Sequence, residues 1–87
     1  MQLPKLKVLV EAGAVREAEA LPDGEGWAVW IVHATRGGER REALERQRGG
    51  LRVFATLDAV ARCLSGAGLN EFRVSVAGWP GAEAEPP

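Results

Sequence analysis

The sequence predicts an α+β fold: a single small domain in the order α-β-β-β-α-β, with a mostly antiparallel sheet packed by two helices. Residues 27–34 (WAVWIVHA) are strand-forming and apolar. Residues 56–67 place apolar side chains at helical spacing, and residues 71–76 alternate apolar and polar side chains. We expect the domain to span residues 1–77 and an acidic, Pro/Gly-rich disordered tail to occupy residues 78–87.

The N-terminal segment Pro4–Ala12 is predicted to form a helix. Leu6, Leu9 and Val10 fall at i, i+3 and i+4 and therefore share one face. The leading proline suits the first turn, where its missing N–H is not needed. Gly13 is suited to end the helix because glycine tolerates positive φ.

The next segment, Ala14–Leu21, allows two interpretations. Its alanines and glutamates favour helix. However, Gly13 interrupts the helical pattern, and the sequence Pro22-Asp23-Gly24 requires a turn. We therefore predict a strand.

The segment Trp27–Ala34 is predicted to be a strand with two apolar faces, because both sets of alternate residues are apolar. Such a strand is usually central and covered on both sides. The two predicted helices can cover one face of the sheet, and a partner subunit is one way to cover the other. Trp27 and Trp30 are three residues apart and therefore point to opposite faces of the strand. We expect one in the core and the other at a dimer or protein-partner interface. Both are candidate partner-binding residues.

Two RGGxR sequences flank the segment Glu39–Gln47. Its composition favours helix, but a helix here would have almost no apolar stripe beyond Ala43 and Leu44. A strand between two Gly-Gly turns would instead pair with Trp27–Ala34 in a hairpin. Its charges would protect a solvated edge strand from aggregation. We predict the strand.

The segment Thr56–Ala67 is predicted to be the second helix, because Thr56 can cap its start and Asp58 suits the positive helix end. One face of the helix carries Leu57, Val60, Ala61 and Leu64. In the following strand, Glu71–Val76, we expect the apolar set to point inward: Phe72, Val74 and Val76.

The composition is that of an ordinary globular domain, with 46% apolar residues, 26% charged residues and a net charge of −1 over 87 residues. The single cysteine, Cys63, excludes an internal disulfide. No apolar stretch resembles a signal peptide or a membrane helix. We therefore expect a cytoplasmic protein without a membrane partner. Because so small a domain has a thin stability margin, we also expect a homo-oligomer or a protein partner.

No motif for catalysis or metal binding is present in the sequence. His33 and Cys63 are the only soft metal ligands, whereas zinc takes three or four protein ligands. Neither Ser65 nor Ser75 lies in a nucleophile turn. The glycine pairs lack the Lys-Ser/Thr ending of a phosphate-binding loop. We therefore predict no catalytic residue, no metal, no cofactor and no enzymatic activity.

The middle of the chain is basic, with six arginines and three glutamates between residues 36 and 52. Arginine binds phosphate well, so an arginine-rich hairpin that contacts DNA or RNA is the alternative functional hypothesis. A solvated charged face is the simpler interpretation. The candidate nucleic-acid-binding residues are Arg36, Arg40, Arg41, Arg46, Arg48 and Arg52.

Three stretches of the chain resemble a known family. They are L-K-V-L-V-E-A-G-A-V (6–15) followed by Gly26-Trp27, then Q-R-G-x-x-R-V-F-A-T-L-D-A-V-A-R-x-L (47–64), and G-L-x-x-F-x-V (68–74). This pattern resembles the small plasmid-borne partition-associated accessory proteins of the ParC type. The resemblance implies a bacterial protein linked to plasmid partition or maintenance, and supplies no functional residues. We therefore expect a non-enzymatic protein-interaction module that is an accessory of plasmid partition or maintenance.

Overall fold

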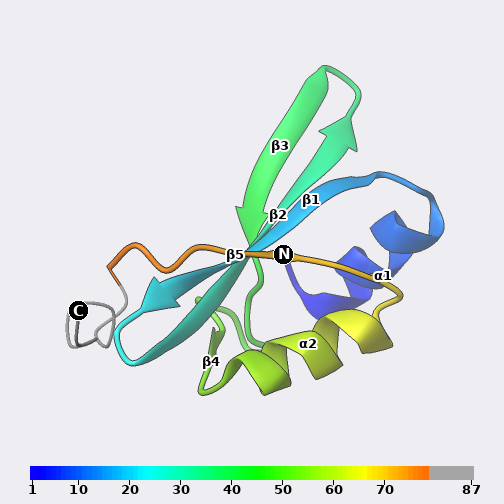
Figure 1. Ribbon diagram of the computed structural model, residues 1–87. Coiled ribbons are helices and arrows are strands. Elements are labelled where there is room, and N and C mark those ends of the chain that lie inside the picture. The colour runs from blue at the N-terminus through cyan, green and yellow to red at the C-terminus, as the bar shows by residue number, and fades with distance from the viewer. Residues whose placement is uncertain (79–87) are drawn as a thin grey trace.

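The computed structural model describes residues 1–78 and confirms the predicted α+β fold, with two helices and a mostly antiparallel sheet (Figure 1). The elements are α1 (Leu3–Glu11), β1 (Val15–Asp23), β2 (Gly26–Thr35), β3 (Gly38–Ala43), β4 (Val53–Phe54), α2 (Leu57–Gly66) and β5 (Arg73–Val74). The predicted order holds, and the two-residue strand β4 is added to it. Almost all of the predicted tail, including Trp79, lies outside the described residues.

Strand β2 is the centre of the sheet, whose order is β3-β2-β1-β5, with β4 also paired to β2. The β1–β2 and β2–β3 pairs are antiparallel hairpins, whereas β5 runs parallel to β1 and pairs with it only at Glu19 and Ala20. In the β1–β2 hairpin, Ala18 lies opposite Ile31 and Ala20 opposite Val29. This register places small side chains of β1 beside large side chains of β2 on one face of the sheet.

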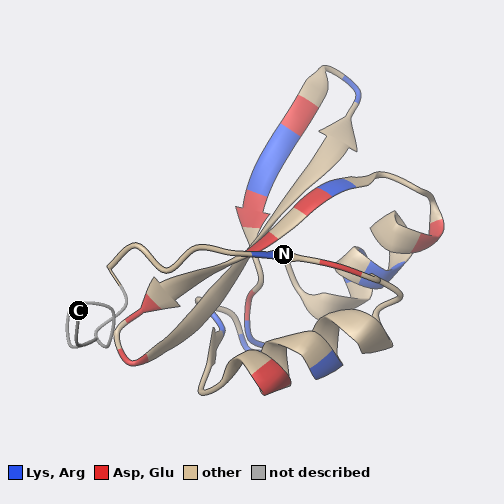
Figure 2. Cartoon of the chain, in the orientation of Figure 1, with Lys and Arg blue, Asp and Glu red and all other residues tan. Residues whose placement is uncertain are grey.

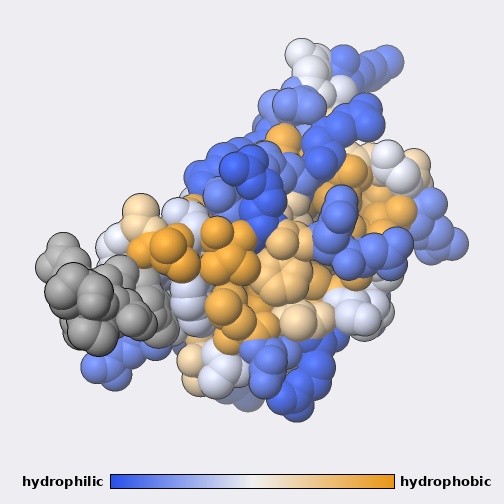
Figure 3. All heavy atoms as spheres, in the orientation of Figure 1, coloured by the Kyte–Doolittle hydropathy of each residue, from blue (hydrophilic) through white to orange (hydrophobic). Residues whose placement is uncertain are grey.

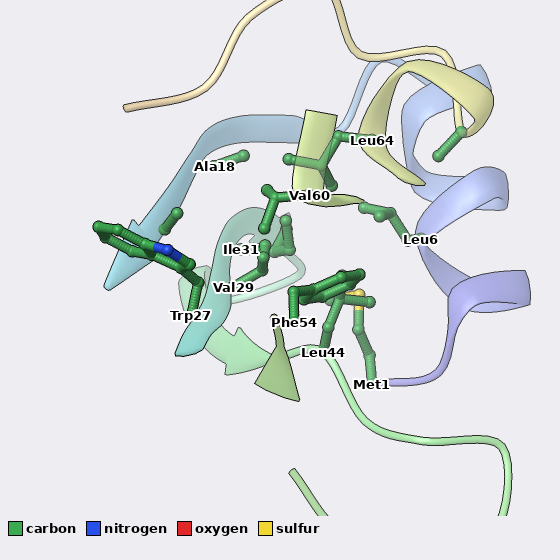
Figure 4. Packing of buried hydrophobic residues seen from close by; sticks show 12 residues of the cluster. Met1, Leu6, Ala18, Trp27, Val29, Ile31, Leu44, Phe54, Val60 and Leu64 are labelled. Atoms are coloured by element: carbon green, nitrogen blue, oxygen red, sulfur yellow. The ribbon is translucent and has the colours of Figure 1, made fainter. Parts of the chain in front are cut away.

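Both helices pack on that face, which we call the helix face (Figure 4). Leu6 of α1 and Val60 and Leu64 of α2 point toward Val29 and Ile31 of β2, and all five are buried. The core of the domain therefore lies between the two helices and one side of the sheet. It also includes Met1, Leu44 and Phe54.

Helix α2 begins as its sequence predicts. The Ala59 N–H donates a hydrogen bond to Thr56 Oγ1 at 3.1 Å, and Asp58 lies in the first turn. Helix α1 begins with its proline in the first turn and ends before Gly13, whose φ is +69°. The apolar stripe predicted for α1 faces the core, and so does that of α2 except for Ala61, which is exposed. Ala59 and Cys63 pack against the core in its place.

The segment predicted as the third strand, Glu39–Gln47, is a strand only as far as Ala43. The chain then leaves the sheet because Leu44 is drawn fully into the core. A turn follows, in which the Gly49 N–H donates to the Arg46 carbonyl. The two-residue strand β4 then returns to pair with β2, with Phe54 opposite Trp27.

The prediction for the last strand is partly wrong. Phe72 is half-buried against the core, but the side chains of Val74 and Val76 are 40% and 59% exposed rather than inward. The reason is that β5 is a two-residue edge strand, so alternation along it does not correspond to a buried and a solvated face. Figure 3 accordingly shows hydrophobic side chains at the surface along the segment that carries β5 and beside α2.

Candidate interaction surface

The face of the sheet opposite the helices has no described helix packed against it. We call this surface the open face. Alternation along the paired strands assigns it the following residues: Glu17, Glu19 and Leu21 of β1, Ala28, Trp30, Val32 and Ala34 of β2, and Glu39, Arg41 and Ala43 of β3. Of these only Ala28 is fully buried, whereas Trp30, Val32 and Ala34 are half-buried. The open face therefore has an apolar centre along β2 that is partly in contact with solvent.

The two tryptophans of β2 lie on opposite faces, as their parity predicts. Trp27 is on the helix face with a 4% exposed side chain and belongs to the core. Trp30 is on the open face and remains half-exposed. Of the two candidate partner-binding residues, Trp30 is therefore the one at the surface.

Trp30 is partly covered by an arginine from the neighbouring strand. The guanidinium carbon of Arg41 lies 4.2 Å from the centre of the Trp30 ring, and Arg41 is paired with Val32 in the β2–β3 register. A guanidinium at this distance is attracted to the negative face of the indole. The guanidinium carries five N–H donors, so those that point away from the ring can still reach another group.

The charges on the open face differ between its two sides. On the β1 side, Arg73 donates to Glu17 at 2.6 Å, whereas Glu19 has no hydrogen bond or ion pair within residues 1–78. On the β3 side, Glu39 lies 3.9 Å from Arg16, and Arg41 has no carboxylate partner among the described residues. Glu19 and Arg41 therefore flank Trp30 on either side, and Glu19 also lies beside Arg73 of β5, whose opposite charge attracts it.

The six candidate nucleic-acid-binding arginines do not form one surface. Arg40 and Arg41 are neighbours on β3 and therefore project to opposite faces of the sheet. Arg41 stacks on Trp30, and Arg52 lies 4.6 Å from the Phe54 ring centre. The exposed remainder lies at the hairpin tip and in the loop after β3: Arg36, Arg46 and Arg48. Figure 2 shows that glutamates interrupt the basic residues along β3.

His33 is buried at the end of the helix face, where it forms part of a polar network. Its Nε2 lies 2.5 Å from the Glu42 carboxylate, which also accepts a hydrogen bond from Lys5 at 3.1 Å and lies 3.8 Å from the Met1 amino group. The His33 bond, with the help of Lys5 and Met1, lowers the pKa of the Glu42 carboxyl below its ordinary value, although burial opposes this. The network connects β2, β3 and the start of α1, so its role is structural.

An open hollow of about 900 Å³ runs along the N-terminal half of β1. It is lined on one side by Arg16 and Ala18 and on the other by the segment 68–73, which includes Phe72. Its charged lining groups include Glu71 and the Glu17–Arg73 pair. Among the described residues, no histidine, cysteine or serine lines it.

The other residues considered for chemistry are dispersed. Cys63 is half-buried on α2 and packs against the core, as a small apolar residue would. Residues 1–78 contain no group of three or more His, Cys, Asp or Glu side chains able to hold a metal ion. His33 contacts a carboxylate and a carbonyl rather than Ser65 or Ser75. The described helices are all too short or too polar to cross a membrane.

The sequence contained a signal for the open face that we did not use. In the segment Val15–Leu21, the glutamates Glu17 and Glu19 alternate with Ala18 and Ala20, which predicts one acidic and one small-residue face. The contact between Arg41 and Trp30 could not have been foreseen, because it depends on the register of the β2–β3 hairpin.

Comparison with known proteins places the chain in a family. A model of the family described as ParC-like matches residues 2–81. No curated protein and no solved structure matches the chain. Since the family match covers nearly the whole sequence, including every helix and strand of the fold, the chain belongs to the ParC-like family, which points to a plasmid-associated accessory protein.

Proposed function

We propose that this protein is a non-enzymatic protein-interaction module that serves plasmid partition or maintenance, and that it binds a protein partner through the open face. One observation carries the proposal: the apolar strand β2 is covered by helices on one face, while its other face presents half-exposed Trp30 and Val32. An apolar surface of this kind is stabilised when a partner removes it from water.

The composition of the open face supports protein binding. Tryptophan and arginine are the residues most enriched among the dominant contacts of protein interfaces, and here Trp30 and Arg41 are in contact. The flanking carboxylates, Glu17 and Glu19, resemble the polar rim that surrounds the apolar centre of such interfaces.

Plasmid retention in a host that carries the encoding plasmid tests this proposal. Cells would be grown without selection, and the plasmid-free fraction counted for the wild type, a gene deletion and the Trp30→Ala variant. We expect the deletion and Trp30→Ala to raise plasmid loss alike. A matched control is Arg62→Ala, which alters an exposed arginine of α2 outside both candidate binding surfaces and should leave retention unchanged. Retention that is indifferent to the deletion would contradict the proposed function.

A second candidate function, binding of nucleic acid, is favoured by one observation. Arg36, Arg40 and Arg48 are exposed and have no ion pair within the described part of the chain. Phosphate contacts release counterions, so such binding would weaken steeply as salt increases. Titration of a DNA duplex or an RNA with the wild type and with a variant carrying alanine at all three positions tests this. Equal affinity for the two proteins would exclude the arginines as the binding site.

A further inference from the structure

We propose that the partner of the open face is a second copy of this chain, packed face to face about a two-fold axis that runs parallel to β2. The inference rests on the proposed function, because both assign binding to the open face. It goes further by naming the partner and the relative orientation of the two sheets.

The first support is the arrangement of charge around Trp30. Strand β1 lies on one side of β2 and strand β3 on the other. On the β1 side, Glu19 lies directly opposite Trp30 in the strand register and has no hydrogen bond or ion pair within residues 1–78. On the β3 side, Arg41 stacks on Trp30 and has no carboxylate partner in that same range. Beside the tryptophan, the open face therefore carries a carboxylate on the β1 side and a guanidinium on the β3 side.

This arrangement is self-complementary under one particular symmetry. A two-fold axis parallel to β2 exchanges the two sides of the face, so that β3 of one copy lies over β1 of the other. Rotation about this axis keeps each residue at its level along β2, so Arg41, at the level of Val32, would lie over Glu17 of the other copy. Its side chain reaches over Trp30, the level of Glu19, so it would meet the carboxylates of both Glu17 and Glu19, and the contact would occur twice. An axis across the strands would instead place β1 over β1 and bring the carboxylates of Glu17 and Glu19 in the two copies together, which is unfavourable.

The dimensions of packed sheets agree with this pairing. Two sheets packed face to face lie about 10 Å apart with their strands within about 30° of each other. An arginine side chain from one copy and a glutamate side chain from the other can bridge this gap. The Arg41 guanidinium lies over one side of the Trp30 ring, and its N–H groups that point away from the ring remain available to a carboxylate of the second copy. Trp30 and Val32 of the two copies would pack near the axis.

Reversal of charge tests the inference with the purified full-length chain. The dissociation constant of the dimer would be measured by sedimentation equilibrium for the wild type, Arg41→Glu, Glu19→Arg and the double variant. We expect each single reversal to weaken the dimer by at least about tenfold, because each change occurs twice about the axis and opposes like charges. The double variant should recover most of the lost affinity because it restores the opposite charges.

The matched control is Arg40→Glu, the same charge change on the same strand but on the other face of the sheet. It should change the dissociation constant by less than about twofold, as is common for substitutions outside an interface. Far-UV circular dichroism of each variant separates loss of association from loss of folding. A monomer at every concentration would overturn the inference, as would a dimer that both single reversals leave intact or that the double variant fails to restore.

The inference and the proposed function can fail separately. If the protein is a monomer but Trp30→Ala still raises plasmid loss, the open face binds a different protein and only the inference fails. If the dimer responds to charge reversal as described but plasmid retention is indifferent to the gene, the dimer is real and the proposed function fails.

Discussion

The two faces of strand β2 use the same alternating pattern of residues for different purposes. On the helix face, Trp27, Val29 and Ile31 are sealed between the sheet and the two helices. On the open face, Trp30 and Val32 keep part of their surface in solvent, and the contact that covers Trp30 is a stacked arginine rather than a helix. Apolar character alone therefore does not distinguish a core residue from a binding residue. The elements packed against it decide which of the two it is.

The largest difference between the faces should appear when each tryptophan is removed. Because Trp27 is in the core, Trp27→Ala should lower the free energy of unfolding by about 3–5 kcal/mol. Trp30→Ala should lower it by only about 1 kcal/mol, because it removes a half-exposed side chain and one cation–π contact. Urea unfolding at protein concentrations low enough to keep the chain monomeric measures both values. Equal losses would mean that the open face is also part of the core.

The Glu42 network should make the helix face sensitive to pH. Glu42→Gln removes the charge that accepts hydrogen bonds from His33 and Lys5 and should cost about 1.5–3 kcal/mol at neutral pH. The folded-state pKa of Glu42 is lowered, so its contribution is present above the unfolded-state pKa and is lost as the pH falls through the folded-state pKa. Unfolding free energies measured from pH 7 to pH 3 should therefore show the gap between wild type and variant closing. A constant gap would contradict this assignment.

The N-terminal cap of α2 stabilises one of the two helices that cover the helix face. Thr56→Ala removes the acceptor of the Ala59 N–H bond and should cost about 1 kcal/mol. Thr56→Ser is the matched control, since it keeps the hydroxyl and should cost much less. Thermal unfolding of the two variants measures the difference, and identical midpoints for both would show that the hydroxyl does not contribute.

The smallest effect is expected on the open face itself. Arg41→Ala should cost about 0.5–1 kcal/mol of folding free energy, the usual value of an exposed cation–π pair. Arg40→Ala should cost close to nothing, because Arg40 is exposed and has no ion pair within the described residues. If Arg41→Ala cost several kcal/mol, Arg41 would be a structural element of the fold rather than a surface residue available to a partner.

Local patterns in the sequence predicted most of the fold. The cap at Thr56, the helical stripes and the opposite faces of Trp27 and Trp30 all follow from spacing within a few residues. The prediction for Val74 and Val76 was wrong, because alternation reveals two faces of a strand only where the sheet continues beside it.

The candidate site was less predictable than the fold. Strand parity indicated that one of Trp27 and Trp30 would be exposed but could not say which, because that depends on where the helices pack. The pairing of His33 with Glu42 and the stacking of Arg41 on Trp30 both depend on the hairpin register between β2 and β3. These contacts arise between residues that are distant in the chain, and a single sequence does not specify them.

The most direct test of the contrast between the two faces is the solution mass by light scattering across protein concentration, for the wild type and for Trp30→Ala. If the open face binds a second copy, the wild type should form a dimer that dissociates on dilution. It also predicts a Trp30→Ala protein that stays folded but remains a monomer at the same concentrations. A wild-type monomer throughout, or a dimer that Trp30→Ala leaves unchanged, would contradict the account.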